Sequence, residues 1–294
     1  MAGAPSPRGF ARFLAGRVVH VGVNGRPEPS KPRIRLLDED PDLGADLSPE
    51  DFQRANRYAV TEVADFDRGV YDPADLGSPD LLGLLVIDGL LIRSVQVAER
   101  RCGELVGPGS LLRPWDHFGR YAPMPFEVRW RVISPVRVAL LDHRITMVAA
   151  RWPVLMHRIV ARAVERSHAL ALDVAIHCLQ HVELRLLVLL WHLADRFGRV
   201  TPEGTVVPLK LSHGDLAELI GSQRPSVSSR LASLAATGLV ERRGDRTWLL
   251  RGDPPSEVRD MRARAGEGNG NGNGGNGHGE VDEDEVRTII AAVK

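Results

Sequence analysis

Cysteine is nearly missing from this chain of 294 residues, since only Cys102 and Cys178 occur. Small secreted scaffolds depend on several disulfides, and a four-cysteine zinc or iron–sulfur site needs four thiolates. The sequence therefore excludes a disulfide-rich scaffold and a four-cysteine metal site within one chain. Such sparse use of cysteine favours a reducing, cytoplasmic compartment.

Long hydrophobic runs are missing as well. The most apolar stretches, 81–91 and 184–194, are interrupted by Asp88 and His192, and both fall short of the ~20 residues that a membrane-spanning helix needs. Residues 1–16 have no sustained apolar segment of the kind found in a signal peptide. We expect no membrane span and no signal peptide.

An excess of one charge is also absent, because 38 basic and 38 acidic residues give a net charge of zero. The whole chain therefore does not indicate a nucleic-acid or membrane partner, and any basic surface must be local. No Gly-x-Ser-x-Gly, phosphate loop or paired-carboxylate pattern occurs, so we predict no enzyme and no cofactor. The length is that of about two domains.

Residues 1–70 are predicted to be an N-terminal extension that is partly helical. One helix start is clear, because Ser48, Pro49 and Asp51 form a capping pattern.

Residues 71–152 change to an apolar period of two, which is typical of half-buried strands, and "FEVRWRVI" shows it most clearly. We interpret "LLGLLVIDGLLIRSV" as a hairpin that turns at Asp88 and Gly89, and "PVRVALLD" as a further strand. These strands predict an antiparallel β-roll and an α+β fold class.

Residues 153–181 are predicted to form one long helix, which starts at Pro153 and contains no later Gly or Pro. Its apolar stripe consists of Leu155, Ile159, Val164, Leu170, Val174 and Leu179. Because this stripe is longer than a modest domain can cover, we predict that the helix pairs with a second copy as in a coiled coil. The alternative is a long helix that packs only on its own roll.

Two histidines, His177 and His181, have the i, i+4 spacing of metal ligands, with Cys178 and Glu183 nearby. Such a pair more often serves packing or lies on a solvated surface. We therefore predict no metal site.

Residues 182–252 predict a winged helix-turn-helix. After a helix that stops at Gly198, Ser212 and Asp215 mark the start of another helix that Gly221 ends. A second helix follows over 222–236, and a gap of about three residues with a glycine sets two helices steeply across each other.

The second helix of this pair leaves a face of small residues exposed, which suits entry into the major groove. Between 206 and 252, seven basic and four acidic residues give a local charge of +3. Helix termini, the small-residue face and a hairpin wing supply the predicted DNA-binding residues: Ser212, His213, Gln223, Arg224, Pro225, Ser226, Ser229, Arg230, Arg242, Arg243 and Arg246. Arg230 is interpreted as a packed stem or a phosphate contact.

Residues 253–294 are predicted to be a flexible, Gly/Asn-rich acidic tail. The acidic segment "VDEDE" could compete with DNA for the basic wing.

The order of roll, long helix and winged helix-turn-helix resembles the Crp/Fnr family of transcription regulators. The segments "LSHGDLAELIGSQRPSVSSRLASLAATGLV" and "PVRVALLDHR" carry the resemblance. It implies a cyclic nucleotide-binding-like roll and a homodimer that binds a palindromic operator in double-stranded DNA, with helix 222–236 in the major groove. RNA polymerase is a further partner of such regulators.

Two departures from the family pattern matter. Pro225 replaces an acidic residue of the recognition helix, so we expect a different operator. Glu127 stands where a cyclic phosphate would need a cation, so we predict that cyclic nucleotides do not control the protein. Two alternatives remain, a protein-interaction dimer whose winged helix no longer binds DNA and a sensor of an unknown small molecule.

Overall fold

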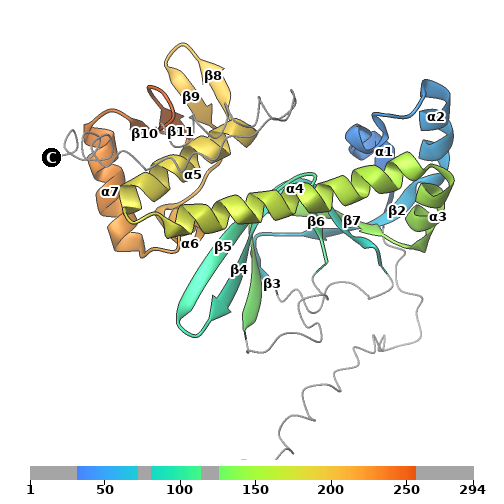
Figure 1. Ribbon diagram of the computed structural model, residues 1–294, viewed down its shortest axis with the longest axis horizontal. Helices are drawn as coiled ribbons and strands as arrows, with labels where there is room; N and C mark the ends of the chain where they lie inside the picture. Colours follow the sequence, from blue (N-terminus) through green and yellow to red (C-terminus); the bar gives the residue numbers. More distant parts are fainter. Residues whose placement is uncertain (1–31, 72–80, 114–125, 256–294) are drawn as a thin grey trace, which may run out of the picture.

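The computed structural model describes residues 32–71, 81–113 and 126–255 (Figure 1). A sheet with flanking helices lies at one end, a small helical domain lies at the other, and one long helix runs between them. Among these described residues, no helix is both long and apolar enough to span a bilayer. The predicted acidic tail lies outside the described residues, except for its first three positions.

The roll is a seven-stranded antiparallel sheet, which confirms the predicted fold class. Its main path has the order β1 (Arg33–Arg35), β2 (Val60–Phe66), β7 (Glu127–Leu141), β4 (Gly83–Val97) and β5 (Arg100–Val106). Two short strands complete it, since β3 (Gly69–Tyr71) pairs with β7 and β6 (Leu111–Leu112) pairs with β4. The sheet thus begins before residue 71, inside the predicted extension.

The predicted hairpin at Asp88 and Gly89 is wrong, because β4 continues straight through this pair. The register against β7 shifts between Val86 and Leu91, which marks a β-bulge. Gly89 has φ +89°, and a Cβ there would lie 2.0 Å from the carbonyl oxygen of Pro135. An Asp-Gly pair serves a bulge as well as a turn, since both need a residue with positive φ.

The strand predicted separately at 135–142 is also part of a longer element, namely β7. Pro135 interrupts its ladder opposite the bulge, because proline has no N–H to donate. The predicted alternation along β7 is confirmed, with Trp130 and Val132 buried at 1% and 5% exposure between exposed or half-buried neighbours. Both strands therefore bend together and enclose the apolar interior of the roll.

Short helices close the end of the roll: α1 (Leu36–Glu39), the 3-10 turn η2 (Pro41–Gly44), α2 (Pro49–Tyr58) and α3 (His143–Arg151). The predicted cap of α2 is confirmed, because the Ser48 hydroxyl accepts a hydrogen bond from the Asp51 N–H at 3.2 Å. Helix α3 was not predicted. It starts where the Asp142 carboxylate accepts from the Arg144 N–H at 2.9 Å.

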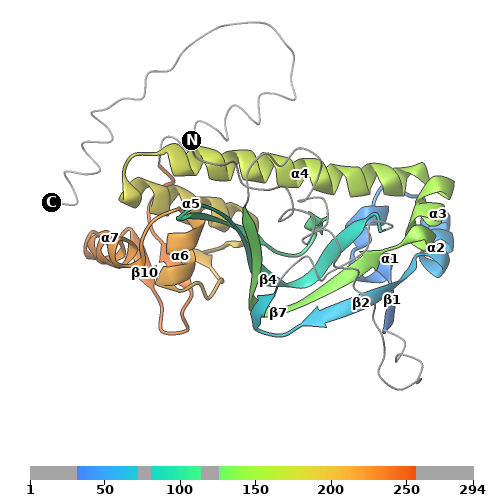
Figure 2. The same ribbon diagram turned by 90° about the horizontal axis from the view of Figure 1, so that it is seen from below.

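The long helix α4 (Pro153–Cys178) crosses most of the molecule, and the roll and the C-terminal domain lie on the same side of it (Figure 2). It ends three residues before the predicted position 181, because Leu179 leaves the helical conformation with ψ 139°. Leu155 and Ile159 face the roll and are buried. Three valines face outward: Val160, Val164 and Val174, with 51%, 47% and 63% of their surface exposed.

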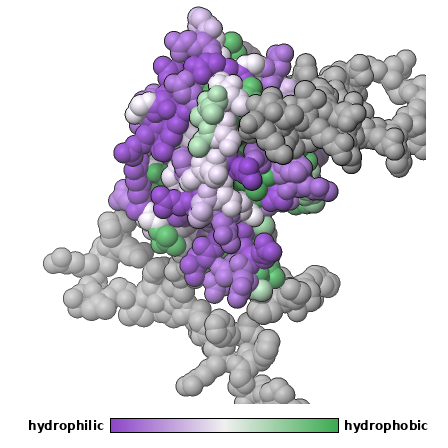
Figure 3. Space-filling model, turned by 90° about the vertical axis from the view of Figure 1, so that its left-hand side faces the viewer, coloured by the Kyte–Doolittle hydropathy of each residue, from purple (hydrophilic) through white to green (hydrophobic). Residues whose placement is uncertain are grey.

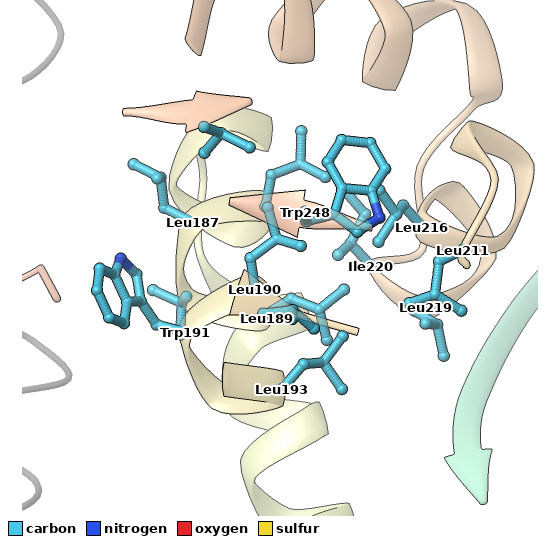
Figure 4. Packing of buried hydrophobic residues seen from close by; sticks show 14 of the residues in the cluster. Leu187, Leu189, Leu190, Trp191, Leu193, Leu211, Leu216, Leu219, Ile220 and Trp248 are labelled. Atoms are coloured by element: carbon cyan, nitrogen blue, oxygen red, sulfur yellow. The ribbon is translucent and has the colours of Figure 1, made fainter. Parts of the chain in front are cut away.

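The C-terminal domain contains α5 (Val182–Phe197), β8 (Arg199–Thr201), β9 (Gly204–Val207), α6 (His213–Leu219), α7 (Arg224–Ala236), β10 (Val240–Arg242) and β11 (Trp248–Leu250). Its strands form a four-stranded sheet of order β10-β11-β9-β8. In the core, Trp248 lies between the leucines of α5 and Leu216 and Ile220 of α6 (Figure 4). This packing holds the two strands of the predicted wing against the helices.

The connection between α4 and α5 is short, since only residues 179–181 separate the two helices. Arg185 secures it: its Nε donates to the carbonyl oxygen of Leu179 at 2.5 Å, and its Nη1 donates to that of Ile220 at 3.4 Å. One side chain thus ties the end of α4 to the end of α6.

Candidate nucleic-acid interface

Helix α6 begins with the predicted cap. The Ser212 hydroxyl accepts from the Asp215 N–H at 3.2 Å, and the Asp215 carboxylate accepts from the Ser212 N–H at 2.6 Å. Gly221 ends this helix with φ +61°, a conformation that favours glycine. The local signals in the sequence thus correctly placed both ends of the first helix.

Helix α7 begins at Arg224, two residues after the predicted start at 222, and Gln223 is its N-cap. Its inner face is formed by Val227, Leu231 and Leu234, which are buried at 0%, 5% and 0% exposure. These side chains pack with Leu216 and Ile220 of α6, as the sequence predicted. The two helices therefore form a helix-turn-helix with a shared core.

The outer face of α7 carries small side chains. Pro225, Ser226, Ser229 and Ala232 are exposed, and the Ser233 hydroxyl donates back to the Ser229 carbonyl at 3.3 Å. Figure 3 looks onto this end of the molecule and shows a weakly polar stripe between strongly hydrophilic surfaces. A helix with such a face can approach another surface closely.

The predicted arginines of α7 have different environments. Arg224 is exposed, and no acidic side chain among the described residues pairs with it. Arg230 instead forms an ion pair with Glu183 of α5 at 2.7 Å between Nη1 and Oε1. Arg224 is thus the free cation at the N-terminal end of α7, while the guanidinium of Arg230 is engaged within the domain.

His213 lies half-buried at the start of α6. Its Nδ1 is 2.9 Å from the Ser228 hydroxyl of α7, and its ring centroid is 6.1 Å from that of Trp248. Burial lowers the pKa of the His213 ring, and the charges of Arg242 and Arg224 lower it further. The ring is therefore mostly neutral at pH 7 and can offer a single N–H. Sequence reasoning missed Ser228, because it considered only the exposed face of α7 and Ser228 lies on the side toward α6.

The wing is a hairpin between β10 and β11, as predicted. The Asp245 carboxylate fixes its turn by accepting from the N–H and the hydroxyl of Thr247, at 3.0 and 2.6 Å. Arg242, Arg243 and Arg246 are all exposed, and the guanidinium of Arg242 lies 5.5 Å from the centroid of the Trp248 ring. A fixed turn thus presents three cations beside α7.

The sheet of the roll also holds α6. The guanidinium of Arg131 on β7 forms an ion pair with Asp215 and a second one with Glu218, the latter at 2.6 Å. Sequence reasoning missed this contact, because the alternation of β7 gives the side of the strand on which Arg131 lies but not its partner. The contact fixes the helix-turn-helix relative to the roll.

A cavity of about 290 Å³ lies between the roll, α4 and α5. Glu104 of β5 lines it and is only 7% exposed. Its carboxylate pairs with Arg93 at 3.3 Å and with Arg166 of α4 at 2.8 Å. The Glu104 carboxylate is thus occupied by arginines of the same chain. Glu127, which stands where a cyclic phosphate would need a cation, pairs with Arg129 at 3.1 Å.

Asp173 lines the same cavity and gives a prediction for pH dependence. Burial, together with the charge of Glu104, raises the pKa of this carboxyl from 3.8 to about 7. Between these pH values the folded protein keeps a proton that the unfolded chain has released, so stability falls as the pH rises through this window.

Asp173→Asn should therefore be more stable than the wild type above pH 7, and the difference should vanish below about pH 4. Thermal unfolding from pH 4 to 8 measures this, with the exposed Asp67→Asn as control. Parallel curves for Asp173→Asn and wild type would contradict it.

The histidine pair considered as a metal site is separated by the end of α4. His177 lies on this helix, whereas His181 is the N-cap of α5. The i, i+4 spacing therefore does not place both rings on one helical face. Within the described ranges, no group of three or more His, Cys, Asp or Glu side chains could hold a metal ion.

Comparison with known proteins places this module in a family. Residues 184–253 match the model of the Crp-like helix-turn-helix domain. A search of curated protein sequences found no match.

Several solved structures share the fold. A CooA variant from Carboxydothermus hydrogenoformans is 17% identical with a TM-score of 0.53, over 70% of this chain and 88% of that one. The c-di-GMP-responsive global regulator CLP of Xanthomonas campestris is 20% identical with a TM-score of 0.50, over 70% and 100% of the two chains. The chain thus carries a Crp-like helix-turn-helix domain and shares its overall fold with these two proteins.

Proposed function

We propose that this protein is a homodimeric transcription regulator of the Crp/Fnr type, which acts in the cytoplasm and binds a palindromic operator in double-stranded DNA. The observation that carries the proposal is the N-terminal end of α7, where exposed Arg224, which has no acidic partner among the described residues, stands beside a face of small side chains. A major groove about 12 Å wide admits one helix when nothing bulky or acidic holds it off.

The side chains around α7 divide into two roles. In this proposal Arg224 contacts base edges, where a guanidinium donates two hydrogen bonds to guanine. Gln223, Ser226 and Ser229 on α7, and Ser212 and His213 on α6, suit phosphate oxygens. On the wing, Arg242, Arg243 and Arg246 suit the backbone beside the same groove.

The exposed valines of α4 support the dimer. Val160, Val164 and Val174 are exposed on α4, and the roll and the C-terminal domain both lie on one side of this helix (Figure 2). Pairing of two copies along these valines would bury them and relate two α7 helices by a two-fold axis. A palindromic operator has the same symmetry.

Control by a cyclic nucleotide is not part of this proposal. Glu104 is neutralised by Arg93 and Arg166, and Glu127 brings a carboxylate to the start of β7. A regulator that binds a promoter also meets RNA polymerase, which we propose as a further partner.

Arg224→Ala tests the proposal. Loss of a base contact should weaken binding to the operator by about 1–3 kcal/mol per protomer and relax the preference for one base. The operator is first selected from random DNA by the wild type, and gel shift then compares both proteins. Exposed Arg57→Ala on α2 is the matched control. An unchanged affinity and base preference would favour a protein-interaction role for the winged helix.

A further inference from the structure

The hairpin of β4 and β5 extends from the roll toward the helix-turn-helix. Its tip consists of Ala98 and Glu99, and the first residues of β5 are Arg100 and Arg101. All four are exposed, although β4 and β5 are well paired behind them. The tip is therefore a defined structure that presents two arginines to solvent.

The hairpin is fixed against the helix-turn-helix by two contacts. A Cβ at Gly103 would lie 3.0 Å from the Cγ of Glu218, which is tighter than an ordinary contact, so glycine favours this close approach. Arg131 of the neighbouring strand pairs with Asp215 and Glu218 on α6. These contacts hold the base of the hairpin close to α6.

A groove of about 710 Å³ separates the tip from the start of α7. Glu99, Arg100 and Arg101 line one wall, and Gln223, Arg224 and Ser226 line the other. Arg101 donates a hydrogen bond to Gln96 at 2.6 Å, and Arg100 has no partner among the described residues. Arg131 forms an ion pair with Glu218, so the groove is lined by three arginines and by one carboxylate, that of Glu99, that has no ion-pair partner among the described residues.

We propose that this groove takes one sugar-phosphate strand of the operator and that Arg100 and Arg101 of the roll contact its phosphates. This inference rests on the proposed function. A helix in the major groove has a backbone strand on either side, and the wing faces one of these strands. The hairpin tip would face a strand at the N-terminal end of α7. The roll would then be part of the DNA-binding surface.

Salt dependence of DNA binding tests the inference. Each phosphate contact contributes about 0.9 to the slope of log affinity against log salt concentration. The double variant Arg100→Ala/Arg101→Ala removes four contacts per dimer, so its slope should be shallower by about 3 to 4. Between 50 and 200 mM salt, it should lose on the order of 100-fold less affinity than the wild type. Operator and random DNA should be affected equally, because phosphate contacts do not read sequence.

Two further variants isolate the cause. Arg100→Lys/Arg101→Lys keeps the charges and should retain the slope of the wild type, while Arg57→Ala/Arg144→Ala removes two exposed arginines from α2 and α3, at the other end of the roll. A slope equal to that of the wild type in the Arg100→Ala/Arg101→Ala variant, or tighter binding by it, would overturn the inference. An equally shallow slope in the Arg57→Ala/Arg144→Ala control or in the lysine variant would also overturn the inference. If Arg224→Ala still weakened binding in those cases, the proposed function would stand. A wild type without salt-dependent DNA binding would overturn both.

Discussion

Val164→Asp should dissociate the proposed dimer and lower its affinity for a palindromic operator by about 10²–10⁴-fold, the gain that linkage of two binding modules provides. Val164 lies on α4 with 47% of its surface exposed. With ~100° per residue, exposed positions 160, 164, 167, 171 and 174 fall within an arc of about 80°. An aspartate on this arc would be buried without a partner in the paired helices, which is strongly unfavourable.

Sedimentation of the free protein and gel shift with the operator measure both effects. The matched control is Val200→Asp, since Val200 on β8 is 88% exposed and lies away from α4. This variant should remain dimeric with unchanged affinity. If Val164→Asp also remained dimeric, pairing through the exposed side of α4 would be excluded.

Asp215→Ala should destabilise the C-terminal domain by about 2–3 kcal/mol. Asp215 is 6% exposed and has two roles, because it closes the capping box of α6 and pairs with Arg131. Its removal leaves the Ser212 N–H without its acceptor and takes away one of the two carboxylates that hold Arg131. Chemical denaturation of the purified protein measures the loss.

The two roles of Asp215 can be separated. Glu218→Ala removes the other partner of Arg131 but leaves the cap intact, so its cost should be smaller. The double variant Arg131→Ala/Asp215→Ala gives the coupling between the two side chains. A coupling near zero would mean that the ion pair between roll and α6 contributes nothing to stability.

The helix-turn-helix could be predicted within two residues, because its signals are local. Ser212 and Asp215 close a cap within one turn, and Gly221 supplies a conformation that other residues avoid. The spacing of Val227, Leu231 and Leu234 then gives the inner face of α7 without knowledge of the rest of the chain. Each of these signals depends on neighbours within a few residues.

The roll was harder to predict, since the same short sequence can form more than one local structure. Asp88 and Gly89 fit a hairpin turn as well as a bulge, and the bulge is seen only once the partner strand with Pro135 is in place. The contact of Arg131 with α6 joins residues 84 and 87 positions apart, and no periodicity announces it. The approach of the β4–β5 hairpin to α7 could not be predicted either, because it also brings together residues that are far apart in the sequence.

The short joint at residues 179–181 has a mechanical consequence. Because Arg185 ties Leu179 of this joint to Ile220 at the end of α6, we expect α4 and the helix-turn-helix to move together. A small twist between two paired long helices would change the separation of the two α7 helices. Operators that differ in the spacing of their half-sites would then be distinguished by torsion of the dimer, even where every contacted base is the same.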